Sequence, residues 1–233
     1  MAKALQEYQS KRDFNATSEP AGKRQPARQA HALQYCIQKH DASHLHYDFR
    51  LELDGTLKSW AIPKGPSLDP KVRRLAVHVE DHPLDYANFE GNIPEGHYGA
   101  GDVIVWDRGI WEPEGDPQAS YAKGKLRFRL RGEKLSGIWN LFRTQLAGKK
   151  EQWMLVKSDD GQARSEAEYN VLEAQPDSVI SERTLVTQPA KPTVKTGKSA
   201  TGKKAPLPER LQPQLATLVD APPSGDWCYE VKF

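Results

Sequence analysis

The sequence predicts a mainly β protein whose core is one small, closed or nearly closed β-barrel with short flanking helices. Short runs of alternating polar and apolar residues recur from Leu33 to about Val156, and this period-two pattern is typical of strands. Glycines fall between or beside the runs, where turns need a permissive backbone. So many short strands in one region favour a barrel, because closure leaves no exposed strand edge.

Clear strand-like runs follow one another along this region, and little helix is expected among them. The runs span residues 45–53, 74–80, 101–107, 125–131 and 152–157. In each run one set of side chains can face a core while the alternate set faces outward. No repeat period is visible, which argues against propellers and solenoids.

The composition indicates that polar segments accompany the barrel. Hydrophobic residues make up 37% of the chain and charged residues 27%, a mixture typical of a normal core diluted by segments that bury little. We expect a basic N-terminal arm at residues 1–30 and the barrel domain at 31–173. A composition rich in Pro, Lys, Gly, Ser and Thr predicts a flexible, disordered basic linker at 174–210. Residues 211–233 are too few to fold alone.

Bulk properties favour a cytoplasmic protein but do not by themselves indicate a nucleic-acid partner. The 33 basic and 31 acidic residues give a net charge of +2, so any binding surface must come from the local distribution of charge. Cys36 and Cys228 provide no disulfide framework, which suits a reducing compartment. No apolar run approaches the roughly 20 residues that span a bilayer, and the N-terminus M-A-K-A-L-Q-E-Y lacks the apolar stretch of a signal peptide. We expect a monomer without membrane contact.

The run at 45–53 carries a candidate metal site. Alternation puts His46, Asp48 and Arg50 on one face, and His40 lies six residues before His46 across D-A-S, a turn that can return its imidazole toward the strand. Two imidazoles and one carboxylate suit a first-row divalent ion such as Mn²⁺ with open positions, and fit a calcium site poorly. Zn²⁺ is not excluded by ligand type. The alternative is a polar face that simply meets water.

A second run, A-V-H-V-E-D-H-P-L-D-Y, can place an anion site beside this metal site. If its strand neighbours the first, His82 and Tyr86 lie beside Arg50, giving two hydrogen-bond donors and a cation around one anion-sized space. Arginine matches phosphate geometry bidentately, and a metal ion beside it would neutralise a second oxygen. The arrangement predicts phosphoryl hydrolysis. His78 is interpreted as a structural histidine.

Several stretches together resemble the 3′-phosphoesterase module of bacterial DNA ligase D, from the non-homologous end-joining pathway. They are Y-Q-S-K-R-D-F, Q-K-H-D-A-S-H-L-H-Y-D-F-R-L-E, L-K-S-W-A-I-P-K-G-P-S, V-H-V-E-D-H-P-L-D-Y and F-E-G-N-I-P-E-G-H-Y-G-A-G-D-V-I-V-W-D-R-G, within residues 7–160. The resemblance implies a small β-barrel with flanking helices and a manganese-dependent site. It also implies two activities, a phosphodiesterase that removes a 3′-ribonucleoside to leave a phosphate and a phosphomonoesterase that removes that phosphate.

The resemblance implies roles for individual side chains at matching positions. The implied metal ligands are His40, His46 and Asp48. The implied contacts to the scissile phosphate are Arg50, His82 and Tyr86. Residues implied to support the diesterase step are Arg12, Asp13, Glu19 and Glu80, and basic contacts in or near the site are Lys64 and Arg74. The basic arm would then fold over the barrel rather than remain a solvated leader.

The C-terminal fragment W-C-Y-E-V-K-F resembles the start of an ATP-dependent ligase domain. Lys232 matches the lysine that becomes adenylated there, but the chain stops before the expected Asp-Gly, so we expect Lys232 to be inert in this chain. The resemblance implies DNA or RNA/DNA 3′ ends in a primer-template duplex as partners during double-strand break repair. It also implies covalent neighbours in a longer ligase polypeptide and a place in the cytoplasm, at the nucleoid.

Two other functions remain open on the residues alone. One is a non-haem iron oxygenase, since H-x-D occurs in the two-His-one-carboxylate triad, although that triad normally takes its last histidine from far downstream and no histidine follows His97. The other is a non-catalytic nucleic-acid-binding barrel acting as a repair scaffold. A basic stripe on one predicted strand face favours the scaffold and consists of Lys125, Arg127, Arg129 and Arg131.

Overall fold

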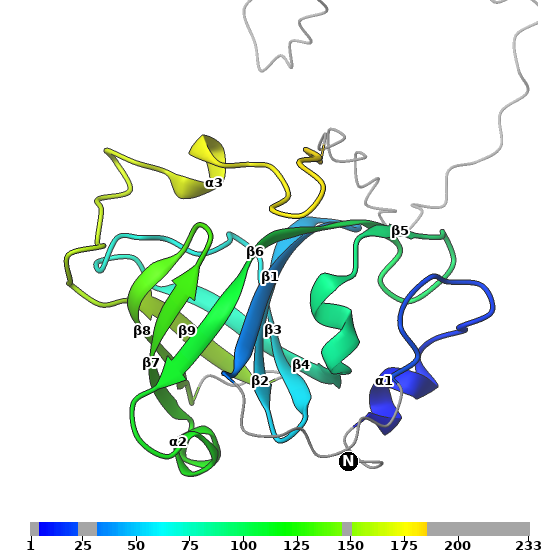
Figure 1. Ribbon diagram of the computed structural model, residues 1–233, viewed down its shortest axis with the longest axis horizontal. Helices are drawn as coiled ribbons and strands as arrows, with labels where there is room; N and C mark the ends of the chain where they lie inside the picture. The colour runs from blue at the N-terminus through cyan, green and yellow to red at the C-terminus, as the bar shows by residue number, and fades with distance from the viewer. Residues whose placement is uncertain (1–4, 23–31, 146–150, 186–233) are drawn as a thin grey trace, which may run out of the picture. The chain divides into compact units, whose positions relative to one another are not determined.

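Nine strands and four short helical segments form the described part of the protein, a computed structural model that describes residues 5–22, 32–145 and 151–185 (Figure 1). The strands are β1 (Gln34–Asp41), β2 (Leu45–Leu53), β3 (Thr56–Ile62), β4 (Arg74–His82), β5 (Gly91–Ile93), β6 (Gly101–Pro113), β7 (Lys125–Gly132), β8 (Ser136–Arg143) and β9 (Gln152–Lys157). The helical segments are α1 (Gln6–Ser10), the 3₁₀ turn η1 (Leu84–Asn88), α2 (Pro117–Lys123) and α3 (Val171–Ala174).

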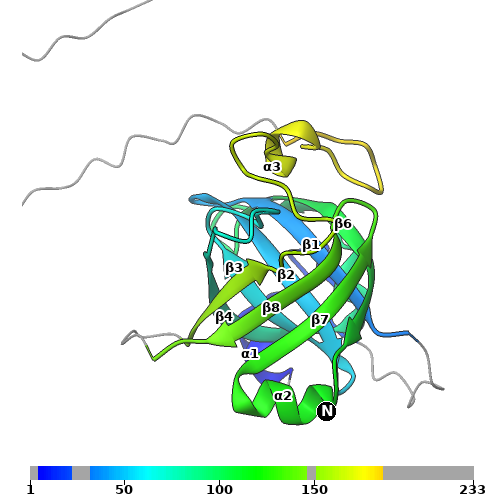
Figure 2. The ribbon, with the colours of Figure 1, turned by 90° about the vertical axis from the view of Figure 1, so that its left-hand side faces the viewer.

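The strands form one antiparallel sheet that closes on itself. Neighbouring strands follow the order β1-β2-β3-β4-β9-β8-β7-β6-β5, and β1 also pairs with β6. This additional pairing closes a ring of eight strands, while β5 pairs with the start of β6, before the part of β6 that β7 joins. The predicted β-barrel is confirmed, and Figure 2 shows it from the side.

Aromatic side chains fill the interior of the barrel. Phe49 of β2 stacks on Phe128 of β7 with ring centroids 6.0 Å apart, and Trp60 of β3 meets Trp153 of β9 at 5.5 Å. All four side chains are buried, since alternation along each strand turns them inward. Because large rings from several walls meet there, the interior is a packed core.

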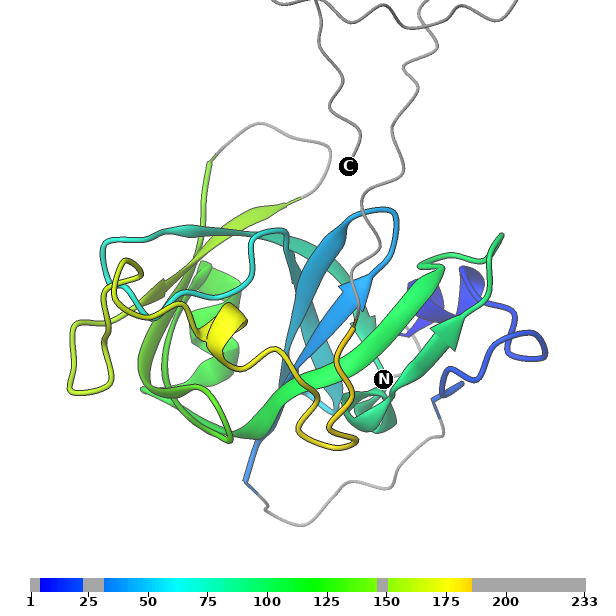
Figure 3. The same ribbon diagram turned by 90° about the horizontal axis from the view of Figure 1, so that it is seen from above.

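A second, smaller hydrophobic cluster lies on the outer face of the barrel wall. Its buried members include Cys36 of β1, Leu57 of β3, Tyr86 of η1 and Tyr8 of α1. The 3₁₀ turn η1 contacts β1, β3 and β6, and α1 contacts β4, so both segments cover this wall from outside (Figures 1 and 3). Both faces of β2 are therefore buried, because its inner face meets the core and its outer face meets this cover.

The ends of the barrel carry the remaining segments. Asp116 caps the start of α2 by accepting from the Ala119 N–H, and Gly124 ends it in the left-handed conformation. Beyond α3 the chain stays on the barrel: the Trp106 indole donates to the Gln175 carbonyl at 2.7 Å, and Val179 N donates to the Val105 carbonyl at 2.9 Å. The contacts of residues 175–185 thus extend past position 173, where we expected the domain to end.

The rest of the expected linker and the segment 211–233 lie outside the described residues. All described residues fall within one structural unit, which spans Met1–Pro192. Among them, no helix is both long enough and apolar enough to cross a bilayer.

Candidate metal and phosphate site

The two predicted histidine ligands and the predicted carboxylate lie together on the outer face of the barrel wall. The β1–β2 hairpin pairs His40 directly with His46, and Asp48 follows two residues later on the same face. The His40 Nδ1 lies 3.6 Å from Asp48 Oδ2, and the His46 Nε2 lies 3.8 Å from Asp48 Oδ1. One ligand atom from each residue falls within 4.8 Å of the others, so this group could hold a metal ion.

Backbone carbonyls orient the two imidazoles. The His40 Nε2 lies 2.8 Å from the Gly99 carbonyl oxygen, and the His46 Nδ1 lies 2.9 Å from the His44 carbonyl oxygen. A carbonyl only accepts, so these two nitrogens donate, and the lone pairs remain on His40 Nδ1 and His46 Nε2. Those are the nitrogens that face Asp48. Such outer hydrogen bonds are typical of metal-binding histidines, and the two-nitrogen, one-oxygen set fits a first-row divalent ion.

Asp48 links the metal group to Arg50. The Arg50 Nη2 donates to Asp48 Oδ2 at 3.1 Å. Burial alone would raise the pKa of Asp48, but the charge of Arg50, with smaller contributions from the neighbouring histidines, outweighs it and holds that pKa well below its ordinary value. The carboxylate is therefore ionised at neutral pH, as a metal ligand must be.

The Arg50 guanidinium is fixed in one orientation on the same outer face. Its Nε donates to Gln38 Oε1 at 2.7 Å and its Nη1 donates to Ser59 Oγ at 2.9 Å. The centre of the guanidinium lies 4.9 Å from the Tyr86 ring centroid. With the bond to Asp48, three of the five N–H groups of Arg50 are engaged; Nη1 also lies 3.0 Å from His82 Nδ1, so the N–H left for a bound oxyanion is the second one on Nη2.

His82 lies against Arg50, although their strands, β4 and β2, are not the neighbours that the sequence argument assumed, since β3 lies between them. Its Nδ1 is 3.0 Å from Arg50 Nη1 and 2.9 Å from the Glu80 carbonyl, and its Nε2 is 3.2 Å from Arg12 Nη2. Because Arg12 only donates, Nε2 accepts, so the proton of the neutral ring lies on Nδ1 and is donated to the Glu80 carbonyl; Nδ1 and Arg50 Nη1 are then in contact without a hydrogen bond. Burial, then the charges of Arg50 and Arg12, lower the pKa of His82 well below its ordinary value. His82 is therefore neutral at pH 7.

The N-terminal segment closes over this cluster. Arg12 donates to Glu19 Oε1 at 2.7 Å and to Glu80 Oε1 at 3.2 Å, and the Tyr86 hydroxyl donates to Glu19 Oε1 at 3.0 Å. The Arg12 guanidinium also lies 4.0 Å from the Tyr8 ring centroid. The other carboxylate oxygen of Glu19 is buried and has no hydrogen-bond partner among the described residues. Three of the residues expected to support the diesterase step, Arg12, Glu19 and Glu80, thus share one network with Tyr86.

Three expected site residues lie apart from it. Asp13 is exposed, and its carboxylate accepts from the Asn15 N–H within its own turn. Lys64 is exposed in the segment after β3. Arg74 shares the inward face of β4 with Ala76, and its Nη2 is paired with Glu166. A bulge in the β3–β4 pairing lies between Arg74 and the site, so Glu80 and His82 turn to the outer face instead.

The sequence reasoning missed several residues of this site. Gln38 is fully buried and bonds Arg50 together with the backbone carbonyls of Tyr86 and Phe89. Its position two residues before His40 placed it on the same strand face, so alternation could have found it. Ser59 could be assigned to the site only from the pairing register of β2 and β3. The Gly99 carbonyl could be assigned to it only from the folded course of the loop between β5 and β6. All of these groups lie on the outside of the barrel wall.

The basic stripe on β7 is partly neutralised. All four of its side chains are on the outward face, but Arg127 pairs with Glu114 at 2.6 Å and Arg131 pairs with Glu112 at 2.7 Å.

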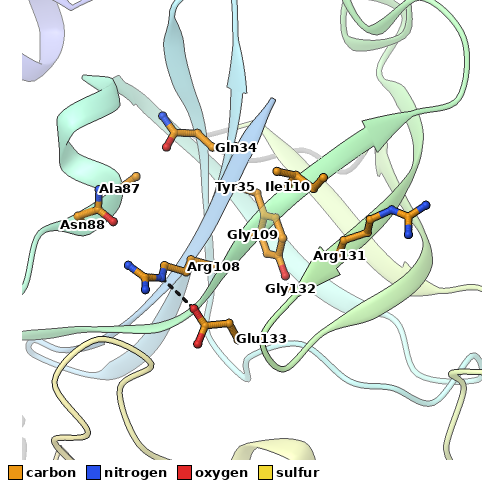
Figure 4. Close-up of a pocket in the computed structure, with 10 residues that line it drawn as sticks. All are labelled: Gln34, Tyr35, Ala87, Asn88, Arg108, Gly109, Ile110, Arg131, Gly132 and Glu133. Atoms are coloured by element: carbon orange, nitrogen blue, oxygen red, sulfur yellow. Dashed lines mark hydrogen bonds and ion pairs between the residues drawn. The ribbon is translucent and has the colours of Figure 1, made fainter. Parts of the chain in front are cut away.

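A depression of about 410 Å³ lies nearby, between η1, β1, β6 and the β7–β8 turn (Figure 4). Its Arg108 is paired with Glu133 at 2.9 Å. This depression shares no residue with the metal group.

Chemically, the site joins a cation-binding group to an anion clamp. His40, His46 and Asp48 supply ligand atoms, Arg50 supplies a charge bonded to Asp48, and the Tyr86 ring packs against that charge. The most accessible member is His46, whose side chain is 23% exposed, whereas that of Arg50 is 3% exposed. A buried cation beside a metal ion stabilises an oxyanion far better than it would in water.

The part of the chain that carries the site matches a known protein family and known relatives. Residues 38–143 match the family described as DNA Ligase D 3′-phosphoesterase domain. The chain is 60% identical over 238 residues to the multifunctional non-homologous end joining protein LigD of Pseudomonas aeruginosa, covering 100% of this chain and 28% of that protein. The corresponding protein of Mycobacterium tuberculosis is 44% identical over 147 residues, covering 62% of this chain and 19% of that protein. The chain therefore spans less than a third of these relatives.

Proposed function

This chain belongs to the DNA ligase D 3′-phosphoesterase domain family through residues 38–143, and from that premise we propose that it hydrolyses phosphate esters at the 3′ ends of nucleic acid. The metal ion is Mn²⁺, held by His40, His46 and Asp48; Zn²⁺ or another first-row ion also suits these ligands. The substrates are primer-template ends that carry a 3′-ribonucleoside, which a diesterase step removes, or a 3′-phosphate, which a monoesterase step removes.

The single observation that carries this proposal is the bond between Arg50 and Asp48. It places the anion clamp next to the metal group on one face of one strand, with Nη2 and Oδ2 3.1 Å apart. A phosphate that meets both groups has its oxygens neutralised from two sides. Neither group alone would indicate phosphoryl transfer.

The chain's own residues hold and polarise the phosphate. Arg50, oriented by Gln38 and Ser59, presents its remaining Nη2 N–H to a phosphate oxygen. Tyr86 and His82 border the same space, and the neutral imidazole leaves Arg50 as the dominant charge. When bound, the metal ion would polarise phosphorus and neutralise a further oxygen. The buried surroundings strengthen each of these interactions.

The network of the N-terminal segment supports the diesterase step. Arg12, Glu19 and Glu80 form one network that contacts His82 and Tyr86. A diester substrate extends beyond its phosphate and so reaches groups that a terminal phosphate does not. Asp13, Lys64 and Arg74, which the structure places apart, are proposed to act through the bound strand or through the fold.

The test is product analysis on a labelled primer-template with a 3′-ribonucleotide, repeated across divalent metals under anaerobic conditions. The wild type is expected to release first a nucleoside and then phosphate with Mn²⁺. His40→Ala and Asp48→Ala are expected to lose at least about 100-fold in rate, since each removes a metal ligand. His44→Ala, in the exposed turn beside the site, is the matched control and should retain activity.

The outcomes separate the alternatives. Binding of the duplex without any hydrolysis would support the non-catalytic scaffold, although the ion pairs of Arg127 and Arg131 already occupy half of the basic stripe. Product formation that requires oxygen would support the iron oxygenase. Equal activity of His40→Ala and wild type would refute the metal site.

We also propose the setting of this activity. The chain acts as a monomeric module, covalently joined to ligase domains in a longer polypeptide, as the size of the relatives suggests. It works during non-homologous end joining in the cytoplasm, at the nucleoid. Size-exclusion chromatography of the purified chain tests the monomer, and a stable dimer would contradict it.

A further inference from the structure

Tyr98 is an exposed aromatic side chain at the edge of the site. It belongs to the glycine-containing loop between β5 and β6, P-E-G-H-Y-G-A. In the described part of the chain, the exposed large hydrophobic side chains are Tyr98, at 43%, and Ile180, at 41%. The other large side chains near the site, such as Tyr8 and Tyr86, are buried. An exposed ring beside buried catalytic groups can receive a ligand.

The position of the Tyr98 ring is set from two sides. The next residue, Gly99, accepts the hydrogen bond from the metal-group histidine His40 at 2.8 Å. On the other side, Lys11 Nζ lies 4.9 Å and the Arg12 guanidinium 5.4 Å from the ring centroid. Arg12 in turn reaches His82. The ring therefore lies against the cations of the N-terminal segment, on a loop whose next residue contacts the metal group.

The two proposed substrates differ at this point. A 3′-phosphate ends at the atoms that Arg50 and the metal group hold, whereas a 3′-ribonucleoside ester continues into a sugar and a flat base. Cations such as Lys11 and Arg12 serve a phosphate, but an uncharged base gains more from an aromatic face. Resting on the proposed function, we propose that Tyr98 is the platform on which the terminal base stacks, and so forms a subsite for the leaving nucleoside.

The cation contacts hold the ring in place while Tyr98 remains 43% exposed. Lys11 forms ion pairs with Glu7 of α1 and Glu80 of β4. These two pairs hold the lysine side chain in place beside the ring. Two turn bonds, from His97 N to the Pro94 carbonyl and from Ala100 N to the His97 carbonyl, fix the loop itself. A ring held in this way loses little freedom when a base stacks on it.

The experiment measures the kinetics of each protein variant on primers that differ in their leaving group. Wild type, Tyr98→Phe and Tyr98→Ala are assayed on three primers, which end in a 3′-adenosine ribonucleotide, in an abasic ribose and in a 3′-phosphate. Ile180→Ala is the control for loss of an exposed hydrophobic side chain elsewhere. Tyr98→Ala should raise KM for the adenosine primer by about 5- to 150-fold, the range expected for one stacked base, and Tyr98→Phe should stay within about 2-fold of wild type.

The abasic and 3′-phosphate primers decide whether stacking is responsible. Neither has a base at that position, so Tyr98→Ala should affect both much less than the adenosine primer. An equal loss on all three primers would show that the ring only supports the loop or Arg12, and no loss on the adenosine primer would remove the subsite. Both results overturn the proposal.

Failure of the proposed function is recognised separately. If the wild type hydrolyses none of the primers, the same oligonucleotides are compared by fluorescence anisotropy in EDTA. Tyr98→Ala should then weaken binding of the adenosine primer more than that of the abasic primer. If Tyr98→Ala weakens binding of the two primers equally, or weakens binding of neither primer, the subsite is refuted. This conclusion holds whether or not the protein is a phosphoesterase.

Discussion

Arg50 is the residue in which the two halves of the site meet. Its three nitrogens bond to Gln38, Ser59 and Asp48, so the charge of Arg50 lies directly beside the carboxylate of the metal group. A guanidinium makes such contacts because its planar fork holds five donors in fixed directions. A lysine would keep the charge but could not satisfy three separate acceptors.

Replacing Arg50 by lysine should therefore lower kcat/KM by about 100-fold, the loss typical of removing one oriented donor to a developing oxyanion. The reason is lost geometry, since the net charge is unchanged. Steady-state kinetics on a 3′-phosphate primer measures the effect. Arg131→Lys, in an exposed ion pair on β7, is the control and should behave as wild type. Full activity of Arg50→Lys would show that charge alone suffices.

The lowered pKa of His82 predicts a pH dependence of stability. The folded protein holds this imidazole neutral, whereas the unfolded chain takes up a proton below the ordinary value of 6.5. The unfolded state then binds more protons, so the free energy of unfolding falls as pH drops below about 6.5, by up to about 1.4 kcal/mol per pH unit from this residue. Denaturant titrations without metal, from pH 7.5 to 5, measure it.

His82→Asn isolates this contribution, because asparagine can still donate to the Glu80 carbonyl but does not titrate. The difference in unfolding free energy between wild type and variant should shrink toward acid pH. His44→Asn, which removes an exposed histidine, is the control. A difference that stays constant between pH 7.5 and 5 would contradict a neutral His82 in the folded state.

At the scale of elements, the β1–β2 hairpin assembles the metal group and the start of β6 supports it. Register pairs His40 with His46 and Asp41 with Asp102. Gly101 opens β6 at a φ of +145°, and a Cβ there would lie 2.2 Å from the Asp41 carbonyl oxygen. Asp41, which directly follows the ligand His40, therefore packs against Gly101 with no room for a side chain at that glycine.

Gly101→Ala should displace this hairpin end. We expect a loss of about 1–3 kcal/mol in the free energy of unfolding from strain and overpacking, together with weaker Mn²⁺ binding. Chemical denaturation and calorimetric metal titration measure the two effects. Gly161→Ala is the matched control, because a Cβ at Gly161 meets no atom within 4 Å. Unchanged metal affinity in Gly101→Ala would show that the hairpin end does not set the ligand geometry.

At the scale of the whole molecule, the barrel core and the site occupy opposite faces of one wall. The aromatic interior holds the sheet closed, while the outer face of β1, β2 and β4 carries the polar cluster beneath α1 and η1. A buried polar cluster is tolerated because nearly every group in it has a hydrogen-bond partner. The rigid wall fixes these side chains better than a loop would.

The described site lies entirely before residue 186, within the unit Met1–Pro192. A chain ending at Pro192 should therefore keep kcat/KM within about 2-fold and unfold within about 0.5 kcal/mol of the full chain, the size of effect typical of changes away from the core. Side-by-side kinetics and thermal unfolding of the two chains measure this. A large loss of either property would place residues 193–233 in the catalytic unit.

The sequence by itself determined the barrel, the strand that carries His46, Asp48 and Arg50, and the identity of the metal-binding group. These follow from local rules, since alternation assigns faces and residue type assigns chemistry. The resemblance of the motifs added Arg12, Glu19 and Glu80, which no spacing argument would have joined to His82.

Only the tertiary structure decided which face of the wall carries the site and which side chains complete it. Closure through the β1–β6 pairing fills the interior with aromatic rings and leaves the polar cluster outside. The β3–β4 bulge turns His82 outward and leaves Arg74 facing inward with Glu166. Register, bulges and closure depend on contacts between residues far apart in sequence, so a pattern read along one strand does not contain them.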